Sequence, residues 1–213
     1  MTMHDDVLRA AKDMLRFGLT AGTSGNISGR TEDGHVVITP SSISYEDMTL
    51  DDLVVLDLEG NVVDGTRHAS SEKALHLECY KLYAEVQSVV HSHPVYATMF
   101  ACVRESIPAV IDEFAIYVGG DVQCAQYAMS GTPELGVNAA REVAEVGTTL
   151  LASHGMVTVG PTPAKTLHQV GVVERSAQII WGARALGPPS ALPAEVNKNF
   201  VMIYKYLRTN PQN

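Results

Sequence analysis

Val89-Val90-His91-Ser92-His93 joins two apolar residues to a pair of histidines that are separated by one residue. Because side chains alternate along an extended segment, the two imidazoles project from one face and can reach a single metal ion. Leu150-Leu151-Ala152-Ser153-His154 repeats the pattern of an apolar run that ends at a histidine. We therefore expect two buried strands to end at one metal site, held by His91, His93 and His154.

The residue types of this group favour a transition metal. Neutral imidazoles bind Zn²⁺ and neighbouring divalent ions, and three of them leave a position open for water or substrate, as in catalytic sites. A single histidine at a strand end is more often a packing residue, so the prediction depends on the pair. Glu72 begins a predicted helix just before the histidine strand, where it either favours the helix dipole or lies beside the metal. The histidines favour a place beside the metal and a catalytic role.

Composition indicates one globular domain that acts on small molecules. The 213 residues are 46% hydrophobic, which suffices for one core, so we expect a single domain over residues 1–213. A formal net charge of −9 without a Lys/Arg cluster disfavours binding to nucleic acid or to an anionic membrane. There is no apolar run of membrane-spanning length, and the start of the chain is acidic, which predicts a cytoplasmic protein.

Periodicity and capping residues predict helices interleaved with strands. A strand is expected at residues 36–38, an antiparallel hairpin over 54–63, and helices at 7–17, 73–83, 95–102, 134–147, 164–186 and from about 193. The hairpin and the lack of a regular strand-helix-strand rhythm favour a mixed or antiparallel sheet flanked by helices. The last helix is expected to cover either its own site or that of a neighbouring subunit.

Smaller features complete these expectations. Ser70 or Ser71 is expected to cap the helix at 73–83, and Thr-Pro pairs at residues 132–133 and 162–163 are expected to start two later helices. Cys79, Cys102 and Cys124 are odd in number and lie among apolar residues, which predicts reduced core thiols.

Three short segments rich in small polar residues are candidates for binding an anion. Gly22–Asn26, Thr39–Ser42 and Ser70–Ser71 offer hydroxyls and free N–H groups, as phosphate-binding loops and helix N-termini do. Each alone is more typical of an ordinary turn. Three such segments in one short chain favour a phosphorylated ligand.

Taken in order along the chain, these segments resemble the class II aldolase and adducin-head family, most closely its bacterial L-fuculose-1-phosphate aldolase branch. The motifs that carry the resemblance span nearly the whole sequence: Gly22-Thr23-Ser24-Gly25-Asn26-Ile27-Ser28, Ile38-Thr39-Pro40, Ser70-Ser71-Glu72, His91-Ser92-His93, Ile107-Pro108-Ala109, Gly119-Gly120 and His154-Gly155. The resemblance implies an αβα sandwich on a largely antiparallel sheet. It also implies a homotetramer with active sites between subunits.

The resemblance further implies which residues form the site. Zn²⁺ would be bound by His91, His93 and His154, with Glu72 beside it as a further ligand and as the acid/base; Co²⁺, Mn²⁺ and Fe²⁺ are alternatives. The positions that match the family's phosphate-binding residues, with Thr23 adjacent, are Thr23, Asn26, Ser41, Ser42, Ser70 and Ser71.

The implied activity is that of a lyase of carbohydrate metabolism. Such an enzyme reversibly cleaves a ketose 1-phosphate, either L-fuculose-1-phosphate or a related deoxyketose phosphate, to dihydroxyacetone phosphate and a short aldehyde. A divalent metal would act as a Lewis acid on the carbonyl, and Glu72 would carry the proton.

One segment departs from the aldolase branch. A family tyrosine that follows Ile-Pro-Ala aligns with Asp112, so Asp112 and the adjacent Glu113 are candidates for a second acid/base, or form an ordinary acidic loop. A phenol could come instead from Tyr117, Tyr127, Tyr204 or Tyr206.

The same segment leaves other reactions open. The methylthioribulose-1-phosphate dehydratase branch carries a catalytic glutamate at about the place of Glu113. Dehydration, epimerisation or decarboxylation of a phosphosugar is therefore the main alternative. A non-catalytic, adducin-like module is disfavoured because Glu72 and all three histidines are present.

Overall fold

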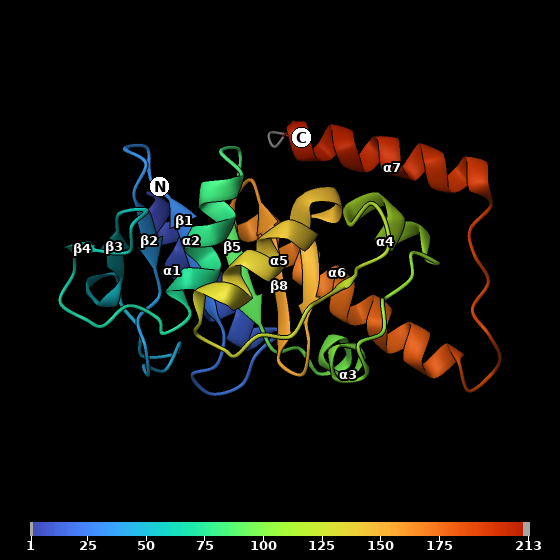
Figure 1. The fold of residues 1–213 in the computed structure, drawn as a ribbon, viewed down its shortest axis with the longest axis horizontal. Helices are drawn as coiled ribbons and strands as arrows, with labels where there is room; N and C mark the ends of the chain where they lie inside the picture. The colour runs from blue at the N-terminus through green and yellow to red at the C-terminus, as the bar shows by residue number, and fades with distance from the viewer. Residues whose placement is uncertain (1, 211–213) are drawn as a thin grey trace.

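Short runs rich in β-branched residues form a central sheet in the computed structural model, which describes residues 2–210 (Figure 1). Within these residues the sheet has eight strands in the order β4-β3-β2-β1-β5-β8-β7-β6. The strands are β1 (Asn26–Arg30), β2 (Val36–Ile38), β3 (Val54–Leu56), β4 (Val62–Asp64), β5 (Ser88–Ser92), β6 (Cys124–Ala125), β7 (Thr148–Leu151) and β8 (Gly155–Gly160). Every neighbouring pair is antiparallel except β6 and β7. The largely antiparallel sheet is confirmed.

Helices cover both faces of this sheet. They are α1 (Met3–Arg16), α2 (Lys73–Leu82), α3 (Val95–Val103), α4 (Asp112–Tyr117), α5 (Pro133–Val146), α6 (Pro163–Ala183) and α7 (Ala194–Thr209), with a 3-10 turn η1 (Leu50–Asp52). Helices α2 and α5 pack together over one face, and α1 and α6 contact the strands from the other (Figure 1). The layers therefore match the predicted αβα arrangement.

Alternation along β5 assigns the two faces of the sheet. Val90 belongs to the apolar cluster on the side of α1 and α6, whereas Val89 belongs to the cluster shared with α2 and α5. Because His91 lies two residues after Val89, its side chain faces the layer of α2 and α5. The face toward which His91 points is thus the one on which Glu72, the residue just before α2, also lies.

Local signals explain most helix boundaries. Helix α1 begins four residues earlier than predicted because Thr2 and Asp5 form a reciprocal capping box. Thr132 and Thr162 each accept a hydrogen bond from a backbone N–H in the first turn of a helix that has proline at its start, as predicted. A helix from about residue 193 is confirmed as α7.

Two expectations were wrong. The N-cap of α2 is Glu72 rather than Ser70 or Ser71, because the Ser70 hydroxyl accepts from the N–H of Glu72 itself and stays within the preceding loop. Cys79 is buried, but Cys102 is exposed since it lies on the outward side of α3, so it is not a core thiol.

No helix among residues 2–210 combines the length and apolarity needed to cross a bilayer.

Candidate active site

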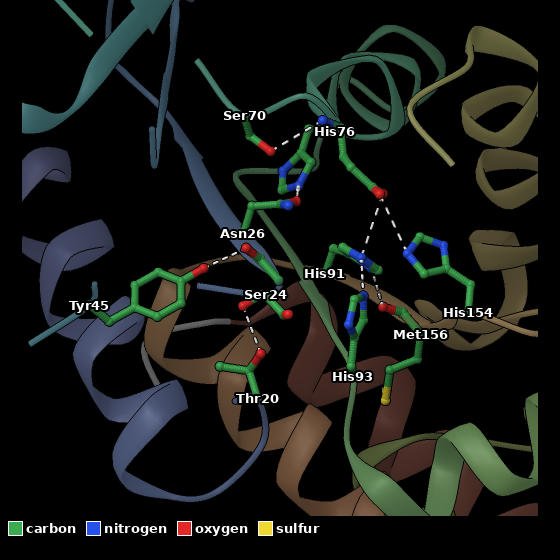
Figure 2. Close-up of polar contacts among 12 residues, drawn as sticks. Thr20, Ser24, Asn26, Tyr45, Ser70, His76, His91, His93, His154 and Met156 are labelled. Atoms are coloured by element: carbon green, nitrogen blue, oxygen red, sulfur yellow. Dashed lines mark hydrogen bonds and ion pairs between the residues drawn. The ribbon is translucent and has the colours of Figure 1, made fainter. Parts of the chain in front are cut away.

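Strand pairing brings the three predicted histidines together. β5 and β8 are antiparallel neighbours with Ser92 opposite Met156, so the end of β5 adjoins the start of β8. His91 lies on β5, His93 follows it, and His154 lies in the turn just before β8. The ring centroids are 4.7 to 4.9 Å apart, and one nitrogen from each ring lies within 4.8 Å of the others (Figure 2). This group can hold a metal ion.

The protonation of His91 follows from its backbone partner. Its Nδ1–H donates to the carbonyl oxygen of Met156 at 2.9 Å, which leaves a lone pair on Nε2. That Nε2 lies 2.9 Å from Nε2 of His93. Burial lowers the pKa of His91 well below its ordinary value and that of His93 to about 4. Both imidazoles are therefore neutral near pH 7, the form that binds metals.

Glu72 supplies a negative charge at the side of the histidine group. Its two carboxylate oxygens lie 3.4 Å from Nε2 of His154 and 3.5 Å from Nε2 of His91, and the residue is only 8% exposed. Oxygen Oε2 is buried without a hydrogen-bond partner. The nitrogen lone pairs of the histidines converge beside this carboxylate oxygen, which has lost its hydration without gaining a partner. A divalent cation bound there would offset the cost of burying these groups. The donor set thus fits a metal of the kind that imidazole favours.

The three small-residue segments meet next to this group. Asn26 begins β1 and lies directly opposite His91 on β5. The N–H of Ile27 donates to the Thr39 hydroxyl at 3.2 Å, and the N–H of Ser70 donates to the Thr39 carbonyl at 3.2 Å. These hydrogen bonds to the Thr39 hydroxyl and carbonyl therefore join the start of β1, the residue after β2 and the loop before α2 into one polar surface.

The predicted phosphate-binding residues differ in exposure on that surface. Asn26 and Ser70 are buried, whereas Thr23, Ser42 and Ser71 are exposed. Ser41 is half-buried, and its hydroxyl donates to the carbonyl of Ala69 at 3.0 Å and accepts from the N–H of Ser71 at 3.1 Å. The structure thus brings these segments together beside the histidines, with part of their hydroxyl and amide groups open to solvent.

Within the described residues, Asp112 and Glu113 do not belong to the group that converges with the histidines. Both lie in the first turn of α4, a helix that the sequence patterns did not predict, and both are exposed. Helix α4 packs against α7 and α6, and it is well separated in Figure 1 from α3, which follows His93.

Sequence patterns also missed a buried histidine next to the polar loops. His76 lies in the middle of α2 and is fully buried, and its Nε2 contacts Oδ1 of Asn26 at 2.6 Å (Figure 2). A lone histidine within a helix gives no signal of its own. Burial lowers its pKa to about 3, so His76 is neutral in the folded protein.

The low pKa of His76 predicts acid sensitivity. The unfolded chain, with an ordinary histidine pKa near 6.5, binds a proton that the folded protein does not, so stability is full above about pH 6.5 and falls as the pH drops toward 3. Between pH 7 and pH 5 the metal-free protein should lose about 2 kcal/mol through this residue. Urea unfolding of the wild type and of His76→Gln at pH 7 and at pH 5 isolates the contribution of His76, since the other histidines are present in both proteins. Equal losses in the two proteins would contradict the prediction.

Gly25 explains how tightly the first polar loop approaches the histidine strand. Its φ is +75°, and a Cβ atom there would lie 2.8 Å from the carbonyl oxygen of His91. Gly25→Ala is therefore expected to destabilise the protein by about 2–4 kcal/mol in urea unfolding, through backbone strain and a steric clash. Gly22→Ala is the matched control, because φ is +60° but the space is open, and it should cost only about 1–2 kcal/mol. Equal losses of stability in the two variants would show that the close approach of Gly25 to the His91 carbonyl oxygen is unimportant.

Comparison with known proteins agrees with this geometry. The family model described as the class II aldolase and adducin N-terminal domain matches residues 5–181. The chain belongs to the class II aldolase and adducin family. The resemblance inferred from the sequence motifs is thereby confirmed.

Individual members of the class II aldolase family resemble most of the chain. A 5-deoxy-D-ribulose 1-phosphate aldolase of Bacillus thuringiensis serovar kurstaki is 33% identical over 196 residues, which cover 92% of each protein. An L-ribulose-5-phosphate 4-epimerase of Salmonella paratyphi B is 34% identical over 198 residues, 87% of each. The solved structure of an L-fuculose 1-phosphate aldolase matches with a TM-score of 0.90 at 35% identity, covering 95% of this chain and 96% of that one.

Proposed function

We propose that the protein is a zinc-dependent aldolase that reversibly cleaves a deoxyketose 1-phosphate to dihydroxyacetone phosphate and a short aldehyde. The observation that carries the proposal is the position of three histidines and Glu72 directly beside a surface of small polar residues. The similarity to a 5-deoxy-D-ribulose 1-phosphate aldolase and to an L-fuculose 1-phosphate aldolase supports this substrate class.

His91, His93 and His154 would hold the metal. Three imidazoles with one open position suit Zn²⁺ at a catalytic site. When bound there, the cation would supply Lewis-acid polarisation of the substrate carbonyl. The role of Glu72 as a further ligand remains a prediction, because the converging group consists of the histidines alone.

The residues of the chain would bind the substrate and move its proton. The hydroxyl and amide groups of Asn26, Ser41, Ser42, Ser70 and Ser71, with Thr23 nearby, would bind the phosphate. In the synthetic direction Glu72 would remove a proton from the hydroxymethyl carbon of dihydroxyacetone phosphate, which then attacks the aldehyde. In cleavage the bond to the aldehyde carbon would break first, its electron pair would stay on the dihydroxyacetone phosphate carbon, and Glu72 would then give a proton to that carbon.

Cleavage also requires a base for the hydroxyl that becomes the aldehyde. We propose that Asp112 or Glu113 reaches the site from a second copy of the chain, because within the described residues neither belongs to the converging group and their helix packs against α6 and α7. This arrangement needs an oligomer, and we propose a homotetramer with sites between subunits.

Epimerisation of a ketopentose phosphate is a second candidate. Its support is the similarity to an L-ribulose-5-phosphate 4-epimerase, together with Asp112 at the position that aligns with the tyrosine of the aldolase branch. The same metal, phosphate and proton-transfer groups would serve both reactions. The position of the substrate's phosphate, carbon 1 or carbon 5, distinguishes them.

One assay tests the proposal against its alternatives. The metal-loaded protein is incubated with L-fuculose-1-phosphate and with 5-deoxyribulose-1-phosphate, and release of dihydroxyacetone phosphate is followed by a coupled NADH-dependent reductase. Release is the expected result. Loss of water from methylthioribulose-1-phosphate in mass spectrometry, or NMR detection of a new epimer from L-ribulose-5-phosphate, without any release would overturn aldol cleavage in favour of the matching alternative.

A further inference from the structure

We propose that His76 is a positioning residue that orients the amide of Asn26 toward the substrate phosphate. The inference rests on the proposed function, since it concerns the orientation of one amide in the proposed phosphate site. Within the described residues, the hydrogen bonds of His76 go to Ser28 and Asn26 and not to the histidine group or the exposed loops. It would act on the phosphate site through Asn26.

The geometry is an unbroken chain of buried side chains between α2 and β1. The Tyr80 hydroxyl lies 2.9 Å from the Ser28 hydroxyl, which lies 2.6 Å from Nδ1 of His76. Nε2 of His76 lies 2.6 Å from Oδ1 of Asn26 (Figure 2). Ser28 and His76 are wholly inaccessible to solvent, and Tyr80 is 2% exposed. Loss of any one member of such a network is costly, because it leaves a buried polar group of its neighbour without a hydrogen-bond partner.

The direction of each hydrogen bond follows from the Asn26 end. An amide oxygen only accepts, so Nε2 of His76 carries the hydrogen and Nδ1 is the acceptor. The Ser28 hydroxyl then donates to Nδ1, and the Tyr80 hydroxyl donates to Ser28. A neutral His76 has one donor and one acceptor, which this chain uses fully, and its pKa of about 3 agrees with that state.

The consequence is felt at the NH₂ group of Asn26. Rotation of the Asn26 amide about its terminal bond would require the other tautomer of His76 and would reverse every hydrogen bond in the network. The hydrogen of the buried Tyr80 hydroxyl would then lose its described acceptor, Ser28, which disfavours the flipped orientation. Within the described residues Nδ2 of Asn26 makes no hydrogen bond, and it is not among the buried unpartnered atoms, so it retains contact with solvent. Two donors are thus left available at the polar surface beside His91, where an anionic group can accept them.

A packing role alone does not require this arrangement. Leucine or phenylalanine would fill a buried position on α2 without bringing polar nitrogen atoms into the core. The buried histidine, serine and tyrosine instead hydrogen-bond to one another, and their network reaches the proposed ligand site at Asn26. The network therefore specifies one amide orientation rather than contributing only to stability.

The test compares His76→Leu, which removes the donor to Asn26, with His76→Gln, whose terminal NH₂ can replace it. In His76→Leu two quantities are expected to rise about 10-fold: the dissociation constant for inorganic phosphate, measured by calorimetry on the metal-loaded protein, and the KM for the deoxyketose phosphate substrate. The kcat should change less than about 3-fold, because Glu72 and the histidines are untouched. His76→Gln should recover most of the loss.

Two further measurements separate positioning from damage to the fold. Metal content by atomic emission should stay at the wild-type stoichiometry in both variants. Asn26→Ala should weaken phosphate binding to a similar degree, and His76→Leu should add little to it in the double variant, since His76 acts through Asn26. If His76→Leu does not fold, Ser28→Ala replaces it: freeing Nδ1 of His76 should weaken phosphate binding about 3-fold.

The outcomes distinguish this inference from the proposed function. If the wild type releases no dihydroxyacetone phosphate from any ketose 1-phosphate, the proposed function fails, while phosphate calorimetry still tests His76. If the wild type binds phosphate but His76→Leu binds it equally well, the inference is wrong. Additive losses in the double variant, or no recovery in His76→Gln, would likewise overturn it.

Discussion

His93→Ala is expected to lose most of its bound metal and to fall by about 10³-fold or more in kcat/KM, because electrophilic activation of the carbonyl contributes several kcal/mol. His93 is the residue of choice for this test. Its Nε2 lies 2.9 Å from Nε2 of His91, so it belongs to the converging group, yet it lies after the last residue of β5. Its removal therefore disturbs the sheet less than removal of His91 would.

The measurement is metal content per chain together with turnover of 5-deoxyribulose-1-phosphate. His35→Ala is a suitable control, since His35 is a partly exposed histidine that pairs with Asp33 away from the site. The control should keep full metal and activity. A full metal complement and normal turnover in His93→Ala would show that the metal centre is wrongly placed.

Glu72→Gln is expected to keep its metal but to lose about 10²–10⁴-fold in kcat. Glutamine has nearly the same shape and preserves the N-cap position of α2, so the fold should persist. It cannot accept a proton from carbon. The expected pattern therefore differs from that of His93→Ala, in which metal and activity disappear together.

Proton exchange isolates the step assigned to Glu72. Dihydroxyacetone phosphate incubated in D₂O with the wild-type protein should lose one proton signal from its hydroxymethyl group in NMR spectra, without any aldehyde present. Glu72→Gln should not support this exchange. Glu78→Gln is the control, because Glu78 lies on the same helix and pairs with Lys81 at 3.0 Å on the surface. Exchange at the wild-type rate in Glu72→Gln would assign the proton transfer to another group.

Local sequence signals accounted for the convergence of the three histidines and for most helices. The spacing of His91 and His93 requires only that the segment be extended, and β5 meets that condition. Thr132 and Thr162 start their helices through short-range hydrogen bonds, which involve residues close in sequence. Features that depend on neighbours along the chain were therefore predictable.

Features that depend on distant neighbours were not. β1 has the sequence Asn-Ile-Ser-Gly-Arg, which is a weak strand pattern, and it forms because it pairs with β2 on one side and β5 on the other. The place of Asp112 and Glu113 depends on how α4 packs against α7. The role inferred for His76 depends on Asn26, which is fifty residues away in sequence.

The pairing of Asn26 with His91 fixes the distance between two parts of the proposed site. Opposed residues of antiparallel strands keep their Cα atoms about 4.5–5.5 Å apart, and a central pair in a sheet is among the least deformable parts of a domain. If Asn26 holds the phosphate and His91 holds the metal, the gap between phosphate and reacting carbonyl is measured by two adjacent strands rather than by loops. Positional isomers of one sugar phosphate would then be distinguished by the spacing of two paired strands.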